Sequence, residues 1–348
     1  MKIAKNFFLW GAGVVLLSQA AVNPLYAFDL GFKCDETYLD LAGAWRRDHL
    51  SSRVTTSGTT ATDVVKADEL NIYQIGLRGC YTPSFNQCEF CGLGAWLDGL
   101  FIKGSAYWGW ANSGEFVQNI GYDTSQIVAP ITSQTDLAKG DIHRGHTWDY
   151  SVGGGYLVPI CEFAKLGPTG GWSYHRLKFK ATNILGTRTN NNTATSTINQ
   201  TMVSVTNPFA YLDEGAEFTS KWTGPWVGLQ GNFYFCDVTL IASYEYHWAH
   251  WHGSFDLGQP DLKDCVHYSD RRHGKRGWGH EATINAYYDI CDCWNLGLGL
   301  SYEYYHVKTM GFAPAAGLTA VGCASSQENM IRTTWHTFAV TADVGYFF

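Results

Sequence analysis

The last sixteen residues, Thr333–Phe348, read TTWHTFAVTADVGYFF and decide the fold. Every second position from Phe348 back to Phe338 is apolar, and several of the positions between carry polar side chains. The apolar set is Tyr346, Val344, Ala342, Val340 and Phe338, and the polar set is Asp343, Thr341 and Thr337. Successive side chains of a strand point to opposite faces, so this spacing predicts a strand with one apolar and one polar face.

The first residues have the features of a secretory signal peptide. Lys2 and Lys5 precede an apolar run over residues 7–17, and small residues follow, with a cleavage site expected after Ala27. The run is about half as long as a helix that spans a bilayer. We therefore expect a signal peptide over residues 1–27 and a single exported domain over residues 28–348.

The composition narrows the class of that domain. Aromatic residues make up 15% of the chain, and it holds 38 glycines but only 9 prolines. Together with the two-residue alternation, this favours an all-β transmembrane antiparallel barrel with an apolar lipid face and a polar lumen. A secreted β-sandwich or soluble barrel is the alternative. Without residues 1–27 the chain has 22 basic and 31 acidic residues, a formal net charge of −9, which argues against nucleic acid as a partner.

Ten segments have strand-like alternation and the length that a tilted strand needs to cross a bilayer. In the second of them, Tyr73, Ile75 and Leu77 alternate with Gln74 and Arg78. The ten segments are residues 37–49, 69–81, 93–110, 146–158, 172–182, 217–235, 238–248, 280–288, 295–307 and 333–348. Their connections alternate between short turns and long polar loops, which predicts an up-and-down barrel with short periplasmic turns and long outer loops.

Two of the long connections have the length to hide more strands. They are residues 111–145 and the stretch NNNTATSTINQT at residues 190–201. Extra hairpins in these connections would raise the count from ten strands to 12–16.

Charged residues on the polar faces are expected to line the lumen. In residues 172–182 we assign the polar face to Arg176, Lys178 and Lys180, and opposite them we expect Glu245 and Glu303. Ten strands lie between the filled eight-stranded barrels and the open porins, so these charges predict a plugged or narrow polar lumen.

Most of the ten cysteines fall at one end of the predicted barrel. The eight expected on the periplasmic side are Cys34, Cys80, Cys88, Cys91, Cys161, Cys236, Cys291 and Cys293, and the two expected in outer loops are Cys265 and Cys323. Disulfides persist outside the cytosol, so these thiols can form local bridges or cross-links to other envelope proteins. The pairing cannot be read from the sequence, and a Cys265–Cys323 bridge between adjacent outer loops is a hypothesis.

The signal peptide, the terminal-Phe strand and the periplasmic cysteines together resemble the cysteine-rich outer-membrane proteins of chlamydiae and their environmental relatives. The resemblance implies a bacterial outer-membrane location. It also implies outer-membrane lipid, lipopolysaccharide and disulfide-linked cysteine-rich envelope proteins as partners. Some major barrels of that group act as porins.

A second, local resemblance is to the omptins, the ten-stranded outer-membrane proteases. It rests on strand length and turn placement over residues 217–252 and 280–308. Omptin chemistry would require an Asp pair facing an Asp–His couple. The matching stretch SGEFVQNIGYD offers only Glu115 and the distant Asp123, and His267 follows Cys265 where an Asp is expected, with Asp264 and Asp270 nearby.

Three other clusters have both a structural and a functional interpretation. CEFC at residues 88–91 has the spacing of a zinc or redox site but lacks a second CxxC. HWAHWH at residues 247–252 places His250 and His252 on one strand face, which suits interfacial packing or a metal. DRRHGKRG at residues 270–277 is a cationic loop tip that could contact phosphates. We predict no catalytic residues, no metal and no cofactor.

These observations lead to one main hypothesis and two alternatives. The main hypothesis is a non-enzymatic, disulfide-stabilised structural barrel of the envelope, with or without a narrow channel. The alternatives are a porin for small solutes and an omptin-like protease that uses His267.

Overall fold

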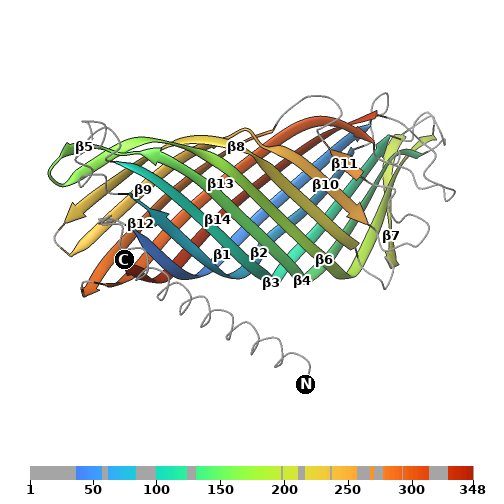
Figure 1. Cartoon of the computed structure of the whole chain (residues 1–348). Coiled ribbons are helices and arrows are strands. Elements are labelled where there is room, and N and C mark those ends of the chain that lie inside the picture. Colours follow the sequence, from blue (N-terminus) through green and yellow to red (C-terminus); the bar gives the residue numbers. More distant parts are fainter. Residues whose placement is uncertain are drawn as a thin grey trace, which may run out of the picture.

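The computed structural model of the chain is a β-barrel (Figure 1). It describes residues 37–56, 62–83, 99–123, 131–196, 199–210, 216–235, 237–256, 267–269, 277–291, 293–312 and 328–347. No helix within these ranges is long and apolar enough to cross a membrane. The predicted signal peptide, residues 1–27, lies outside the described residues.

The regular structure of these ranges consists of strands that follow one another along the chain. They are β1 (Tyr38–Thr56), β2 (Thr62–Tyr81), β3 (Leu100–Asp123), β4 (Ile131–Tyr156), β5 (Val158–Cys161), β6 (Ala164–Ser196), β7 (Asn199–Ala210), β8 (Ala216–Phe235), β9 (Val238–His247), β10 (His250–Asp256), β11 (His267–Ser269), β12 (Trp278–Cys291), β13 (Trp294–Phe312) and β14 (Glu328–Phe347).

Ten of the described strands close into an antiparallel ring, which confirms the predicted fold class and strand count. The ring order is β1, β2, β3, β4, β6, β8, β9, β12, β13 and β14, and β14 pairs back onto β1. That pairing runs from Tyr38↔Phe347 to Thr56↔Asn329 without a shift in register. Strand β10 continues the edge of β9 along β8, while β5 and β7 extend β6 at opposite ends.

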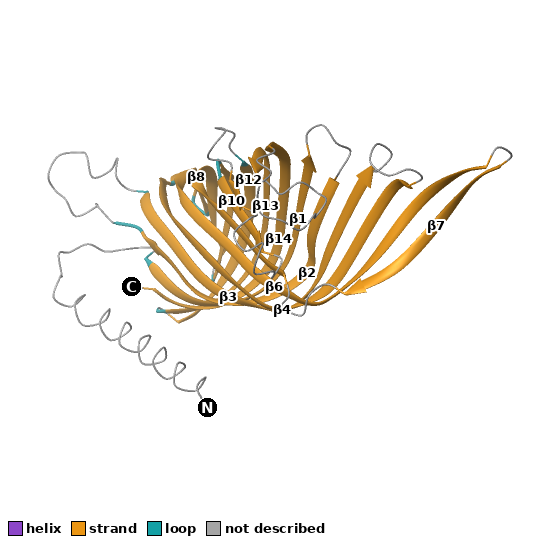
Figure 2. Cartoon of the chain, turned by 90° about the vertical axis from the view of Figure 1, so that its right-hand side faces the viewer, coloured by secondary structure: helices purple, strands orange, loops and turns teal. Residues whose placement is uncertain are grey.

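The two ends of the barrel differ (Figure 2). At one end, here the terminal end, the start of β1 meets the end of β14, and the short β8–β9 and β12–β13 connections turn. At the other, the loop end, β6 and β7 project as a long hairpin paired from Leu185↔Ala210 to Ser196↔Asn199. Most of the predicted strands run between the terminal end and the loop end, as expected for an up-and-down barrel.

The strands are longer than the sequence pattern predicted, and they lengthen toward the loop end. Residues 111–145 were expected to be a long loop, but β3 continues to Asp123 and β4 begins at Ile131, with Glu115 opposite Asp141. Of the NNNTATSTINQT stretch, residues 190–196 belong to β6 and residues 199–201 to β7, and these two strands pair outside the ring. The predicted long outer loops are thus largely strand at these two places, because ladder hydrogen bonds tolerate polar side chains on both faces.

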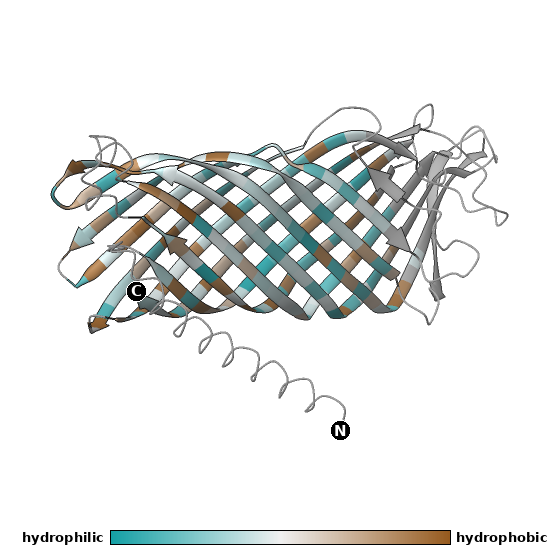
Figure 3. Cartoon of the chain, in the orientation of Figure 1, coloured by the Kyte–Doolittle hydropathy of each residue, from teal (hydrophilic) through white to brown (hydrophobic). Residues whose placement is uncertain are grey.

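The outer face is apolar near the terminal end and charged near the loop end. Figure 3 shows how hydrophilic and hydrophobic residues alternate along the strands. The exposed apolar side chains of the terminal half include Leu39, Leu41, Ile75, Leu77, Ile102, Val152, Leu229, Leu298 and Val344. The exposed side chains of the loop half include Arg53, Lys66, Lys139, Asp141, His143 and Arg332. Since a tilted strand needs only about 9–11 residues to cross a bilayer, the loop half extends beyond the apolar belt.

The inner face has the opposite arrangement. Toward the loop end the interior is filled by buried apolar side chains such as Leu50, Leu70, Phe116, Phe179 and Phe218. The prediction that Arg176, Lys178 and Lys180 line the lumen is therefore wrong. They share the outer face of β6 with the half-exposed Trp172 and alternate with buried residues from Ser173 to Ala181. Beyond the apolar belt, the polar face of a strand is the one that points out of the barrel.

This inversion can be tested at two adjacent residues of β6. Phe179 is 1% exposed and stacks on Phe218 at a ring-centroid distance of 5.4 Å, whereas Lys178 pairs with Glu217 on the outer surface. We expect Phe179→Ala to lower the free energy of unfolding by about 3–5 kcal/mol, and Lys178→Ala to lower it by about 0–1 kcal/mol. Urea unfolding of detergent-folded protein, followed by the gel mobility shift, measures both. Equal losses would contradict an apolar interior at this level.

Candidate functional site

The interior of the ring is layered, and the layers can be followed along single strands. Inward residues of β1 pass from Asp40 through Ala42 and Ala44 to Arg46 and Asp48, and only then to Leu50. The inward residues of the antiparallel strand β14 follow the same order of layers, from Asp343 through Thr341 and Ala339 to Thr337 and Trp335. Polar side chains thus form a basal layer and a central layer, with small residues between them and apolar ones beyond.

The basal layer lies near the terminal end and is built on Arg78 of β2. Arg78 Nη2 lies 2.5 Å from Asp343 Oδ2, and its Nε lies 3.3 Å from Asp40 Oδ2. Its Nη1 donates to Asn285 Oδ1 at 2.8 Å, and Tyr287 donates its hydroxyl to Asp40 at 3.2 Å. These contacts tie β2 to β1, β12 and β14 across the lumen.

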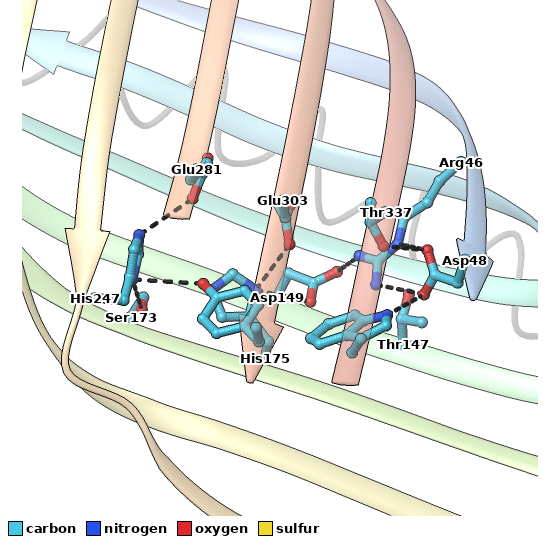
Figure 4. A network of polar contacts seen from close by, with 12 residues as sticks. Arg46, Asp48, Thr147, Asp149, Ser173, His175, His247, Glu281, Glu303 and Thr337 are labelled. Atoms are coloured by element: carbon cyan, nitrogen blue, oxygen red, sulfur yellow. Dashed lines mark hydrogen bonds and ion pairs between the residues drawn. The ribbon is translucent and has the colours of Figure 1, made fainter. Parts of the chain in front are cut away.

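The central layer is built on Arg46 of β1 (Figure 4). Its Nε and Nη2 bind both oxygens of Asp48 at 2.6 and 2.7 Å, and its Nη1 binds Asp149 Oδ2 of β4 at 2.7 Å. The guanidinium lies 4.9 Å from the ring centroid of Trp335. Arg46 is 2% exposed, so this is a buried, two-carboxylate ion pair.

Neutral donors complete the coordination of the two carboxylates that Arg46 binds. Asp48 accepts from Thr337 Oγ1 at 2.5 Å and from Trp335 Nε1 at 3.1 Å, while Asp149 accepts from Gln74 Nε2 at 2.7 Å. Buried carboxylates are costly unless their lone pairs are satisfied, so these donors hold the ionised pair in place.

Two histidines continue the central layer. His175 Nδ1 lies 3.3 Å from Asp149 Oδ1 and 3.8 Å from Glu303 Oε2, and its Nε2 lies 2.9 Å from the hydroxyl of Tyr305. His247 Nδ1 lies 3.0 Å from Ser173 Oγ. Polar contacts therefore run from Arg46 on β1 as far as His247 on β9.

Three carboxylates lie on the far side of this layer. His247 Nε2 is 3.5 Å from Glu245 Oε2 and 3.6 Å from Glu281 Oε2. Lys103 Nζ binds the other oxygen of Glu245 at 2.8 Å. Glu281 and Glu303 have no ion pair with Lys or Arg among the described residues.

A cavity of about 160 Å³ separates the basal and central layers. Its wall includes Arg46, Arg78, Glu245, Glu281 and Glu303, and small hydroxyl residues fill the gaps between the charges. Charged and hydroxyl side chains line part of the cavity, and it is large enough for several water molecules.

An apolar layer covers the central layer on its loop-end side. Tyr305 stacks on Trp335 at 5.6 Å and packs on Trp222 at 5.4 Å, and Trp222 meets Trp251 at 6.1 Å. The layer comprises Leu50, Leu70, Phe116, Phe179, Phe218, Trp222, Trp251, Tyr305 and Trp335, all less than 2% exposed. These inward side chains come from seven strands of the ring and from β10, and each has almost no contact with solvent, so the described interior at this level is apolar.

The sequence identified only part of this interior. Of the five residues predicted to line the lumen, Glu245 and Glu303 lie inside. The interior cations Arg46, Arg78 and Lys103 were not predicted as lumen charges, although Arg78 was placed opposite the apolar face of its strand. Each stands on the opposite face from outward apolar residues, as Arg78 does between Leu77 and Gly79, so strict alternation counted from the apolar face could have found them.

The predicted cysteines are partly described. The Sγ atom of Cys80 lies 3.9 Å from Thr82 Oγ1. Cys161 and Cys293 are free thiols at the terminal end of the barrel. Cys291 lies at the end of β12, and its side chain is outside the described residues, as are Cys34, Cys88, Cys91, Cys236, Cys265 and Cys323. Disulfide formation stays a prediction.

The residues weighed for omptin-like chemistry are also partly described. Glu115 is exposed on the outer face of β3 and lies 3.3 Å from Lys139. His267 begins β11, and Asp264 and Asp270 lie outside the described residues. Glu115 therefore does not face the lumen.

A family model and the solved structure of one outer-membrane protein agree with this architecture. The family model described as "Protochlamydia outer membrane protein" matches residues 40–348. The outer membrane protease OmpT of Escherichia coli aligns over 91% of this chain and 98% of its own, with a TM-score of 0.57 and 14% identity. The translocator domain of the autotransporter NalP of Neisseria meningitidis aligns over 97% and 98%, with a TM-score of 0.31 and 13% identity. A search of curated protein sequences found no match.

The ion pair at the centre of the site can be tested with a neighbouring control. Arg46→Ala leaves Asp48 and Asp149 buried without their cation, and we expect it to lower the free energy of unfolding by about 3–5 kcal/mol. Arg47→Ala removes an exposed pair with Glu69 and should cost about 0–1 kcal/mol. Urea midpoints of the detergent-folded proteins give both values. A small loss for Arg46→Ala would mean that the central layer is not held by this pair.

Proposed function

The chain belongs to the Protochlamydia outer membrane protein family, and from that premise we propose that it is a structural barrel of the outer membrane whose lumen is closed to solutes. Its location in the outer membrane and its ten-stranded ring follow from the family and the fold. The structural role and the closed lumen are the proposal.

One observation carries the proposal: the apolar layer between the central layer and the loop end. An ion that crossed it would lose its hydration against aromatic and aliphatic side chains, at a cost of many kcal/mol in a medium of low polarity. The ion-selectivity filters of conducting channels are instead commonly lined with backbone carbonyls or charged side chains.

The polar layers support a mechanical role. Arg46 joins β1 to β4 across the lumen, and Arg78 joins β2 to β12 and β14. These links run between strands that are not ladder neighbours, so they resist deformation of the barrel cross-section in a way that the β-ladder alone does not.

The cysteine distribution supports attachment to other envelope proteins. Barrels of this class keep their termini and short turns in the periplasm. The terminal end, with Cys161 and Cys293 at its turns, is then the periplasmic end. We infer that thiols at this end form disulfides with cysteine-rich periplasmic partners, and that the charged loop half faces lipopolysaccharide.

Conductance in a planar lipid bilayer tests the closed lumen. The purified, detergent-folded protein should give no discrete openings with or without reductant. The double variant Trp222→Ala, Trp335→Ala removes two aromatic side chains of the apolar layer and should produce openings. Trp172→Ala, on the lipid face, is the matched control and should remain silent. Reproducible ion-selective openings of the unaltered protein would replace the proposal with a porin function.

Disulfide attachment is tested separately, by non-reducing gels of intact envelopes. The protein should migrate in high-mass species that reductant dissolves, and Cys161→Ser should reduce their amount, because Cys161 is an exposed thiol at the periplasmic end. Ser151→Ala, inside the lumen, should not change them. Purely monomeric migration from oxidised envelopes would contradict this part of the proposal.

A further inference from the structure

We propose that Glu245, His247 and Glu281 bind a divalent first-row transition-metal ion inside the barrel. The inference goes beyond the structural role proposed above and does not depend on it. Whether or not the lumen conducts, the three side chains remain a donor set built from two neighbouring strands, β9 and β12.

The spacing of the donors suits a metal. His247 Nε2 lies 3.5 Å from Glu245 Oε2 and 3.6 Å from Glu281 Oε2, and all three donor atoms lie within 4.8 Å of one another. Ligands of a tetrahedral ion with bonds of about 2.0–2.1 Å lie about 3.3–3.4 Å apart. A direct charge-assisted hydrogen bond would instead bring nitrogen and oxygen to about 2.7–2.9 Å.

The imidazole of His247 points into the cluster, but its nitrogen there has no hydrogen-bond partner. The residue is 1% exposed, and its Nε2 makes no hydrogen bond. A buried ring nitrogen left in this state is costly, and a metal bond satisfies it. The site is therefore more than a group of acidic residues, because a buried nitrogen ligand is already aimed at the two carboxylates.

The second ring nitrogen is held by hydroxyl groups. Ser173 Oγ lies 3.0 Å from His247 Nδ1, and the hydroxyl of Tyr305 lies 3.4 Å from it. With the proton on Nδ1 donated to Ser173, the lone pair of Nε2 faces the carboxylates. Outer contacts of this kind fix the tautomer and orientation of histidine ligands in metal sites.

The charge of the central layer favours a bound cation. The layer has five carboxylates but only two fixed cations among its described residues. Arg46 pairs with Asp48 and Asp149, and Lys103 pairs with one oxygen of Glu245. The other acids of the layer are Glu281 and Glu303. Uncompensated carboxylates in a closed interior are strongly unfavourable, and a divalent ion beside Glu245 and Glu281 would offset two of the excess negative charges.

The donor types identify the class of ion. One imidazole and two carboxylates suit Zn²⁺, Co²⁺ or Mn²⁺ better than Ca²⁺, which takes oxygen ligands alone. Glu245 and Glu281 also line the cavity of about 160 Å³, so water molecules can complete the coordination. The Glu281 side chain is 21% exposed, against 7% for Glu245 and 1% for His247.

The test uses Co²⁺ as the probe, because its visible spectrum reports coordination by nitrogen and oxygen. Thiols would compete for the ion, so the cysteines are alkylated in the unfolded full-length protein before it is refolded in detergent and stripped with chelator. Titration with Co²⁺ should show one saturable site per chain, and Zn²⁺ should displace the cobalt.

Variants link that site to the three residues. Glu281→Gln and His247→Gln should each weaken Co²⁺ binding by at least about tenfold, and Ser173→Ala by about 10–100-fold. Lys103→Met removes a competing positive charge and should tighten binding by about tenfold. This last change acts in the opposite direction from damage to the fold, so misfolding cannot imitate it.

Two controls address other histidines and acids. His336 and Glu217 lie on the outer surface, and His336→Gln and Glu217→Gln should leave the affinity unchanged. Heat-dependent gel mobility shows whether each variant has folded. A stoichiometry near zero in folded protein, or binding that survives both Glu281→Gln and His247→Gln, would overturn the proposal and leave the cluster as an ion pair.

Discussion

The structure depends on one constraint: each ring strand continues without interruption from an apolar environment into water, while its side chains keep alternating every second residue. In the terminal half the outer face touches lipid and the inner face is polar. In the loop half the outer face is wet, so the inner face must supply the apolar core. The barrel therefore resembles a membrane protein at one end and a soluble protein at the other, with the same strands serving both.

This exchange of faces explains what the sequence could and could not predict. Segments within the apolar belt were assigned correctly, as Tyr73, Ile75 and Leu77 show by their exposure. Beyond the belt, a polar side chain no longer indicates the face that lines the lumen. Arg176, Lys178 and Lys180 therefore lie on the outer face of the barrel. The stretches around Glu115 and Asp141 look like loops because neither face is continuously apolar, yet their ladder pairing continues.

The contacts within the interior polar layers could not be predicted from the sequence, for a different reason. Arg46 meets Asp149 more than a hundred residues away, and Glu281 meets His247 across a strand pair whose register no local pattern specifies. Only the ring closure brings these groups to one level. Side chains that look like isolated charges on separate strands become two connected networks once the strands share a lumen.

The pairing of β1 with β14 has a consequence for how the chain is made. The first and last described strands are hydrogen-bond neighbours along their whole length, so the seam joins the two segments that are farthest apart in synthesis. Contacts of such long sequence separation form slowly. A partly formed ring that lacks β14 has β1 and β13 as open sheet edges, and such edges can pair with any other strand they meet.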